Sequence, residues 1–140
     1  MEDPVKNSLL IVDDERQNLF LLSHILGGDY RIYTAKDGQE AILKARELKP
    51  DLILLDIIMP GMSGYHVIGE LKGMPETKDI PVVFVTGLDS DEDEEYGLEL
   101  GAADYIYKPI GKGITRKRVG NQIAIVNLTR ALEQTQRSQP

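Results

Sequence analysis

The feature that most constrains the fold of this chain is an alternation between two kinds of apolar pattern along its 140 residues. Short continuous apolar runs of strand length are followed by longer stretches in which apolar residues recur every three or four positions. This alternation is typical of βα units, in which helices cover both faces of a parallel sheet. The sequence therefore predicts one doubly wound α/β domain with five parallel strands.

Boundary signals place the individual elements. Asp37 and Ser63 can cap the second and third helices, and Glu40 can complete a capping box. Gly27 and Pro50 end the first two helices. The expected strands are 8–12, 30–35, 52–56, 82–86 and 104–108, and the last two helices are expected at 89–100 and 114–135. The expected inner helix faces are Leu19, Leu22 and Leu26, then Ala41, Ala45 and Leu48, then Val67, Ile68 and Leu71.

Composition narrows the classes of function. A net charge of −7 disfavours binding to nucleic-acid backbones, which needs clustered basic residues. The chain has no cysteine, so disulfides and thiol chemistry are excluded. We find no signal peptide and no apolar run of the ~20 residues that span a bilayer. These features predict a cytoplasmic protein without direct nucleic-acid or membrane binding.

The domain is expected to cover residues 8–132, with an N-terminal tail at 1–7 and a C-terminal tail or the start of a linker at 133–140. The last helix carries two apolar stripes, and Ile125, Leu128 and Leu132 form the second at heptad-like spacing. That stripe predicts a helix continuing into another domain or a dimeric coiled coil, against the alternative of a broad core face. A stand-alone protein and the amino-terminal piece of a longer one both fit.

Polar residues follow four of the expected strands. Asp13 and Asp14 follow the first strand, Asp56 ends the third, Thr86 ends the fourth and Lys108 ends the fifth. In an open parallel sheet these carboxyl ends meet at one edge, where ligands bind. An unpaired ionised carboxylate is costly inside a buried strand, so Asp56 is expected to be paired or to perform chemistry. We therefore predict one polar pocket.

Three carboxylates in one pocket repel one another, at a cost of about 4 kcal/mol for a pair ~4 Å apart at an effective dielectric of ~20. A hard divalent cation relieves this repulsion, and Mg²⁺ prefers oxygen ligands. The predicted ligands are Asp13, Asp14, Asp56 and the backbone carbonyl of Ile58. Lys108 adds a second positive charge, fixed in direction if its bond to Pro109 is cis. With these parts Asp56 can accept a phosphoryl group by in-line attack.

The sequence resembles the receiver domain of bacterial two-component response regulators over about residues 8–132. The motifs that carry the resemblance are VDDE (12–15), LLDIIMPGMSG (54–64), FVTG (84–87) and GAADYIYKPI (101–110). The resemblance implies a flavodoxin-like sheet of order 2-1-3-4-5. It also implies Asp56 as phosphoacceptor, Asp13 and Asp14 as magnesium ligands, Thr86 as switch hydroxyl, Lys108 as the invariant lysine and Tyr105 as switch aromatic.

The resemblance further implies partners. A histidine kinase or phosphotransfer protein would donate the phosphoryl group, and an output domain outside this chain would respond. A homodimer would use the fourth helix, fifth strand and fifth helix. Ile58 and Leu88 depart from the common pattern because neither side chain can orient a hydrolytic water, which predicts slow dephosphorylation. The Gly111–Gly113 segment, where helix formers are usual, leaves the start of the last helix open.

Two other classes of function compete with a phosphorylated switch. A Mg²⁺-dependent phosphatase would want an acid two residues after its nucleophile, where this chain has Ile58. An inert interaction module would not need the complete set of pocket residues. Other features have ordinary explanations: His24 and His66 lack companion ligands, and the acidic run 89–95 and basic run 112–118 fit solvated helix surfaces. We therefore expect a phosphoacceptor that does not turn over as an enzyme.

Overall fold

The computed structural model describes residues 6–138 and contains five strands and five helices in strict alternation within that range. The predicted N-terminal tail therefore lies, apart from Lys6 and Asn7, outside the described residues. The elements are β1 Ser8–Val12, α1 Arg16–Leu26, β2 Arg31–Ala35, α2 Gly38–Leu48, β3 Leu52–Leu55, α3 Gly64–Lys72, β4 Val82–Thr86, α4 Asp91–Glu99, β5 Asp104–Tyr107 and α5 Lys112–Ser138.

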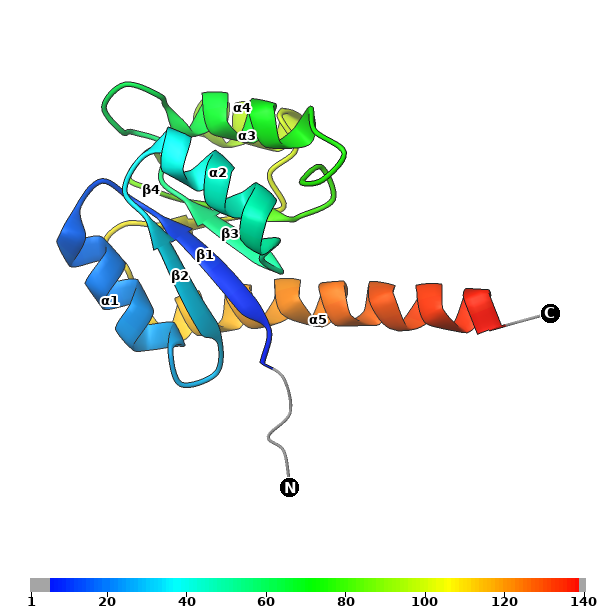
Figure 1. Cartoon of the computed structure of the whole chain (residues 1–140). Helices are drawn as coiled ribbons and strands as arrows, with labels where there is room; N and C mark the ends of the chain where they lie inside the picture. The colour runs from blue at the N-terminus through cyan, green and yellow to red at the C-terminus, as the bar shows by residue number, and fades with distance from the viewer. Residues whose placement is uncertain (1–5, 139–140) are drawn as a thin grey trace.

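The strands form one parallel sheet in the order β2-β1-β3-β4-β5, which confirms the predicted flavodoxin-like topology (Figure 1). Helices α1 and α5 cover one face, and α2, α3 and α4 cover the other (Figure 1). Two separate apolar cores result, and the four residues of β3 are fully buried between them. Burial on both faces explains why β3 reads as a continuous apolar run.

Most of the predicted local signals are present. The Asp37 side chain accepts a hydrogen bond from the Glu40 N–H at 2.8 Å, and Ser63 caps α3 through the His66 N–H at 3.3 Å. The Glu40 carboxylate reaches the N–H of Lys36 rather than that of Asp37. The predicted inner face of α2 was wrong at Leu48, which is exposed because it is the last residue of the helix.

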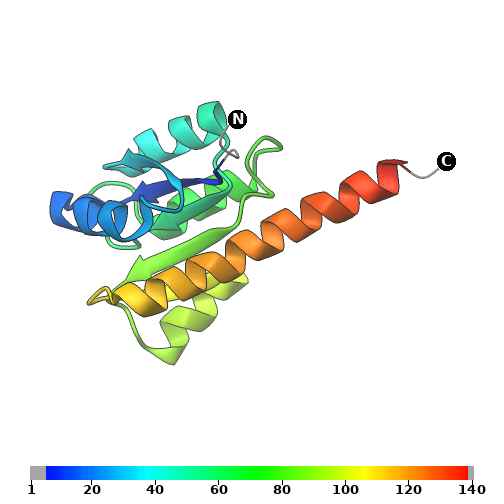
Figure 2. The same cartoon turned by 90° about the horizontal axis from the view of Figure 1, so that it is seen from below.

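Helix α5 is longer than the sequence pattern predicted. It begins at Lys112 despite the neighbouring glycines and continues for 27 residues, through the predicted tail boundary at residue 133. Its first half packs on the sheet through Val119 and Ile123, and Asn127 and Arg130 still contact the domain. The C-terminal part of the helix projects past the edge of the domain (Figures 1 and 2). None of the helices within residues 6–138 combines the length and apolar character needed to cross a bilayer.

Candidate functional site

The acidic residues predicted to meet at the carboxyl edge of the sheet do meet there. Asp56 follows β3, and its N–H donates to the Val12 carbonyl of β1 at 3.0 Å. Lys108 follows β5, and its N–H donates to the Thr86 carbonyl of β4 at 2.9 Å. The sheet hydrogen bonds therefore continue one residue past the strands and fix the backbone from which the polar side chains project.

Lys108 joins two of the acids. Its Nζ lies 3.2 Å from Asp13 Oδ2 and 3.4 Å from Asp56 Oδ2, and its peptide bond to Pro109 is cis. The other oxygen of Asp13 accepts the Glu15 N–H at 2.9 Å. Both Asp13 and Asp56 are buried, so the ammonium group compensates charges that bulk water does not reach.

The carboxylates of Asp13, Asp14 and Asp56 each place an oxygen within 4.8 Å of the others. Three carboxylates and one ammonium leave a formal charge of −2, which one divalent cation would neutralise. Asp14 is exposed and opens the cluster to solvent, so a cation there can keep several waters, as Mg²⁺ prefers. The donor set therefore fits Mg²⁺. Ile58, the source of the predicted carbonyl ligand, donates its own N–H to Asp56 Oδ1 at 3.3 Å.

The electrostatics of the pocket follow from burial and crowding. Burial, followed by the negative charge of Asp13, raises the pKa of Asp56 to about 6, although Lys108 acts in the opposite direction. Burial alone would lower the pKa of Lys108, but the Asp56 and Asp13 carboxylates outweigh it and the pKa is raised. Without a cation, Asp56 thus carries its charge at a clear cost.

The two predicted switch residues lie on neighbouring strands, Thr86 at the end of β4 and Tyr105 within β5. The Thr86 hydroxyl oxygen accepts the Leu88 N–H at 3.1 Å. Tyr105 is buried, its hydroxyl donates to the Asp93 carbonyl in the first turn of α4 at 3.1 Å, and its ring contacts Phe84. The hydroxyl group therefore ties β5 to α4.

Gly97 makes the buried position of Tyr105 possible, and sequence reasoning missed it. A Cβ at Gly97 would lie 1.8 Å from the Tyr105 hydroxyl oxygen and 2.9 Å from Tyr105 Cζ, so any side chain there would exclude the ring. The only sequence signal is a glycine inside a helical pattern, which costs about 1 kcal/mol relative to alanine and so indicates a packing reason.

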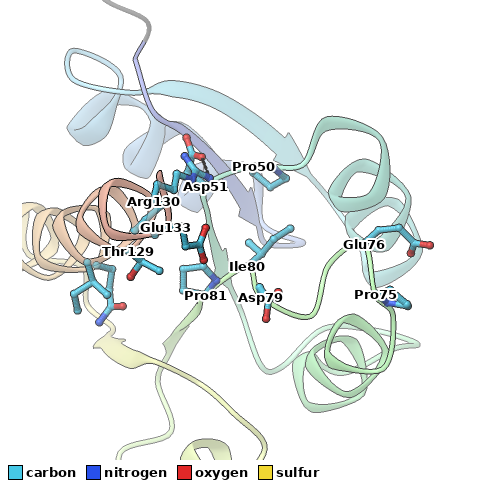
Figure 3. A pocket seen from close by; sticks show the side chains of 13 residues that line it. Pro50, Asp51, Pro75, Glu76, Asp79, Ile80, Pro81, Thr129, Arg130 and Glu133 are labelled. Carbon is cyan, nitrogen blue, oxygen red and sulfur yellow. Dashed lines mark ion pairs between the residues drawn. The ribbon is translucent and has the colours of Figure 1, made fainter. Parts of the chain in front are cut away.

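A second polar cluster lies at the opposite, amino end of the strands, next to a hollow of about 350 Å³ between α5 and the loops before β3 and β4 (Figure 3). Asp51 pairs there with Arg130 of α5 at 2.6 Å, drawn as a dashed line in Figure 3. Asp51 also accepts the Ser8 N–H at 2.8 Å and the Asn7 side-chain amide at 3.2 Å. These partners satisfy the hydrogen-bonding capacity of the Asp51 carboxylate. The cluster therefore ties α5 to the start of β1 and to the loop before β3 and is not a ligand site.

The fold and the acidic cluster together define a flavodoxin-like α/β domain of the kind found in bacterial signalling proteins. The chain belongs to the response regulator receiver domain family, since residues 9–120 match that family's model. It is therefore a receiver domain of two-component signalling. Such domains hold Mg²⁺ in an acidic pocket and are generally not catalytic.

Individual relatives agree with this assignment. The chain is 45% identical over 119 residues to a probable cyclic di-GMP phosphodiesterase of Vibrio cholerae, covering 85% of this chain and 27% of that protein. It is 47% identical over 103 residues to the response regulator PleD of Caulobacter vibrioides, covering 73% of this chain and 23% of PleD. The chain thus spans about a quarter of these relatives.

Two further matches extend over nearly the whole of the other chain. The chain is 34% identical over 117 residues to protein PilH of Pseudomonas aeruginosa, covering 83% of this chain and 97% of PilH. The crystal structure of a protein from Chloroflexus aurantiacus, named a putative response regulator, superposes with a TM-score of 0.80 at 32% identity. The match covers 85% of this chain and 98% of that one. The same fold therefore occurs both alone and as part of longer proteins.

Proposed function

We propose that the chain is a phosphorylation-dependent switch in which Asp56 accepts a phosphoryl group from a histidine kinase or phosphotransfer protein. The observation that carries the proposal is the position of Lys108 Nζ between Asp13 and Asp56, at 3.2 and 3.4 Å. The ammonium group is thus held where it can contact both the phosphoacceptor and an oxygen of an arriving phosphoryl group. Membership of the receiver family supports the same role.

The proposed chemistry needs little beyond positioning and charge compensation. A carboxylate oxygen of Asp56 attacks phosphorus while the bond from phosphorus to the donor histidine nitrogen breaks, and that nitrogen leaves with the electron pair. Mg²⁺, held by Asp13, Asp14, Asp56 and the carbonyl of Ile58, would neutralise phosphoryl oxygens. Lys108 contacts another of these oxygens. The departing imidazole nitrogen would take any proton it needs from solvent, so the step needs no further acid from the pocket.

The switch step is proposed for Thr86 and Tyr105. The Thr86 hydroxyl would turn from the Leu88 N–H to donate to the phosphoryl group on Asp56. That movement changes the packing beside Tyr105, whose hydroxyl is bonded to the backbone of α4. The face formed by α4, β5 and α5 would then change and control an output domain or partner.

The partners and setting of the switch are also proposed. The relatives that extend well beyond the aligned region support an output domain joined to this one, and a homodimer would use the α4-β5-α5 face. The basic start of α5 is partly used within the chain, where Arg118 pairs with Asp104 of β5 at 2.8 Å. We place the protein in the cytoplasm, without direct nucleic-acid or membrane binding.

Dephosphorylation is proposed to be slow. Ile58 is 64% exposed, and neither its side chain nor that of Leu88 can hydrogen-bond an attacking water. Ile58→Asn should shorten the lifetime of the phosphorylated form, by about fivefold if the new hydrogen bond contributes about 1 kcal/mol in the transition state. Decay in the presence of Mg²⁺ measures this, and a lifetime of seconds in the unmodified protein would contradict the proposal.

One experiment separates the switch from a phosphatase and from an inert module. The purified chain is incubated with a small-molecule phosphodonor and Mg²⁺, and both protein-bound phosphoryl groups and released phosphate are followed. The switch predicts labelling of at most one group per chain and little further release. Continuous phosphate release would indicate an enzyme, and the absence of labelling would indicate an inert module.

A further inference from the structure

We propose that the second half of α5 is a dimerisation helix that pairs in parallel with α5 of a second copy of this chain. The pairing surface, here called the α5 seam, comprises Asn121, Ile125, Leu128, Leu132 and Thr135. Successive seam residues are separated by four, three, four and three positions, the spacing of a two-stranded coiled coil. The seam begins where α5 still packs on the sheet through Val119 and Ile123 and continues onto the part of the helix that projects past the domain (Figure 2). It is separate from the phosphorylation pocket.

The exposure of the seam is the first argument. Ile125, Leu128 and Leu132 are 56%, 62% and 56% exposed, although each carries a large aliphatic side chain. The domain instead packs against Val119 and Ile123, which lie on the opposite side of the helix at 3.6 residues per turn. Leu128 and Leu132 therefore add nothing to the core of their own domain, and Ile125, which lines the hollow between α5 and the loops before β3 and β4, adds little.

The placement of charge is the second argument. Between residues 119 and 138 the sequence has three charged side chains, Arg130, Glu133 and Arg137, and all three fall on the side opposite Leu128. A helix surrounded by water carries charge on its solvent side. Here the side that faces away from the domain is uncharged and apolar, the reverse of the usual arrangement, which indicates that another surface covers it.

The chemistry of the seam favours a second copy as the partner. Ile125 at one core position and Leu128 at the next match the preference of parallel dimers for a β-branched residue at a and leucine at d. The flanking positions nearest the seam hold Ala124, Thr129 and Ala131, so two identical helices meet without like-charge repulsion. Because the domain packs on the opposite side of α5, the two domains would lie on the outer sides of the paired helices.

Sedimentation of the 140-residue chain, without phosphodonor or Mg²⁺, tests the proposal. We expect a monomer–dimer equilibrium that the double substitution Leu128→Gln and Leu132→Gln weakens by about a hundredfold or more, since two core layers are lost. Leu43→Gln, at an exposed leucine of α2, is the matched control and should leave the equilibrium unchanged. A chain that stays monomeric at every concentration, or a dimer that tolerates the double substitution, would overturn the proposal.

Cross-linking tests the orientation, because the chain has no cysteine of its own. In a parallel pair each seam residue faces its own counterpart, so Thr135→Cys should form an intermolecular disulfide readily under mild oxidation. Glu133→Cys, two residues away on the charged side, should not. Equal cross-linking of the two variants, or none for Thr135→Cys, would contradict the parallel pairing. A dimer through the α4-β5-α5 face alone gives no reason for Thr135→Cys to cross-link in preference to Glu133→Cys.

Discussion

Two aspartates flank β3, with Asp51 just before Leu52 and Asp56 just after Leu55, and their surroundings differ in kind. Burial would raise the pKa of Asp51, but hydrogen bonds from the Ser8 N–H and from Arg130 outweigh it and the pKa is lowered. Burial and the charge of Asp13 raise the pKa of Asp56 to about 6. A carboxylate with enough partners holds elements together, whereas one left with too few is available for a cation or a phosphoryl group.

Substitution of each aspartate should separate the two roles. Asp51→Ala should lower the free energy of unfolding by about 2 kcal/mol, because the Ser8 N–H and the Arg130 guanidinium lose a charged acceptor. Asp56→Asn should keep or raise that free energy, since it removes a negative charge beside Asp13. Urea unfolding measures both, and an equal loss for the two variants would end the distinction.

Magnesium should stabilise only a chain with an intact pocket. At a Mg²⁺ concentration tenfold above its Kd, binding to the folded state adds about 1.4 kcal/mol to the free energy of unfolding. The effect should persist in Asp51→Asn and be lost in Asp13→Asn. Thermal unfolding with Mg²⁺ or with a chelator checks this. A response in Asp13→Asn as large as in the unmodified chain would place the cation elsewhere.

Gly97 of α4 and Tyr105 of β5 extend the comparison to the packing between these two elements. Gly97→Ala should destabilise the chain, because the new Cβ meets the Tyr105 ring. In a Tyr105→Ala background the same substitution should cost much less, since the clash with the ring is gone, helix propensity favours alanine and only the close contact with Phe84, at 3.1 Å, remains. A double-mutant cycle by chemical unfolding measures this coupling, and an equal cost of Gly97→Ala in both backgrounds would show that the ring does not occupy this slot.

The contribution of Asp51 to the free energy of unfolding should depend on pH, an effect smaller than those above. Because its folded pKa is lowered, its contribution is present above the unfolded value of about 3.9 and is lost as pH falls through the folded pKa. Unfolding midpoints measured from pH 6 downward should therefore fall more for the unmodified chain than for Asp51→Asn. Parallel curves for the two proteins would contradict this.

The sequence predicted the carboxyl edge of the sheet well, because strand ends are local features and the doubly wound topology brings them together. Asp13, Asp14, Asp56 and Lys108 lie together as expected, and the strands agree with their predicted bounds to within one residue.

The amino edge was not predicted, since its contacts depend on tertiary placement that no local pattern records. Asp51 pairs with Arg130, which lies 79 positions further along the chain. Asn7 forms a side-chain hydrogen bond with Asn127 of α5. The slot at Gly97 was missed for the same reason, because the clash that requires glycine comes from β5. Leu48 was assigned to the core by periodicity alone, although it is the last residue of its helix.

The most direct test of the account is intact mass spectrometry of three proteins after treatment with a small-molecule phosphodonor and Mg²⁺. The account predicts one added phosphoryl group on the unmodified chain and on Asp51→Asn, and none on Asp56→Asn. Labelling of Asp56→Asn to the same extent, or an unmodified chain that never gains mass while it binds Mg²⁺, would contradict the claim that Asp56 is the phosphoacceptor.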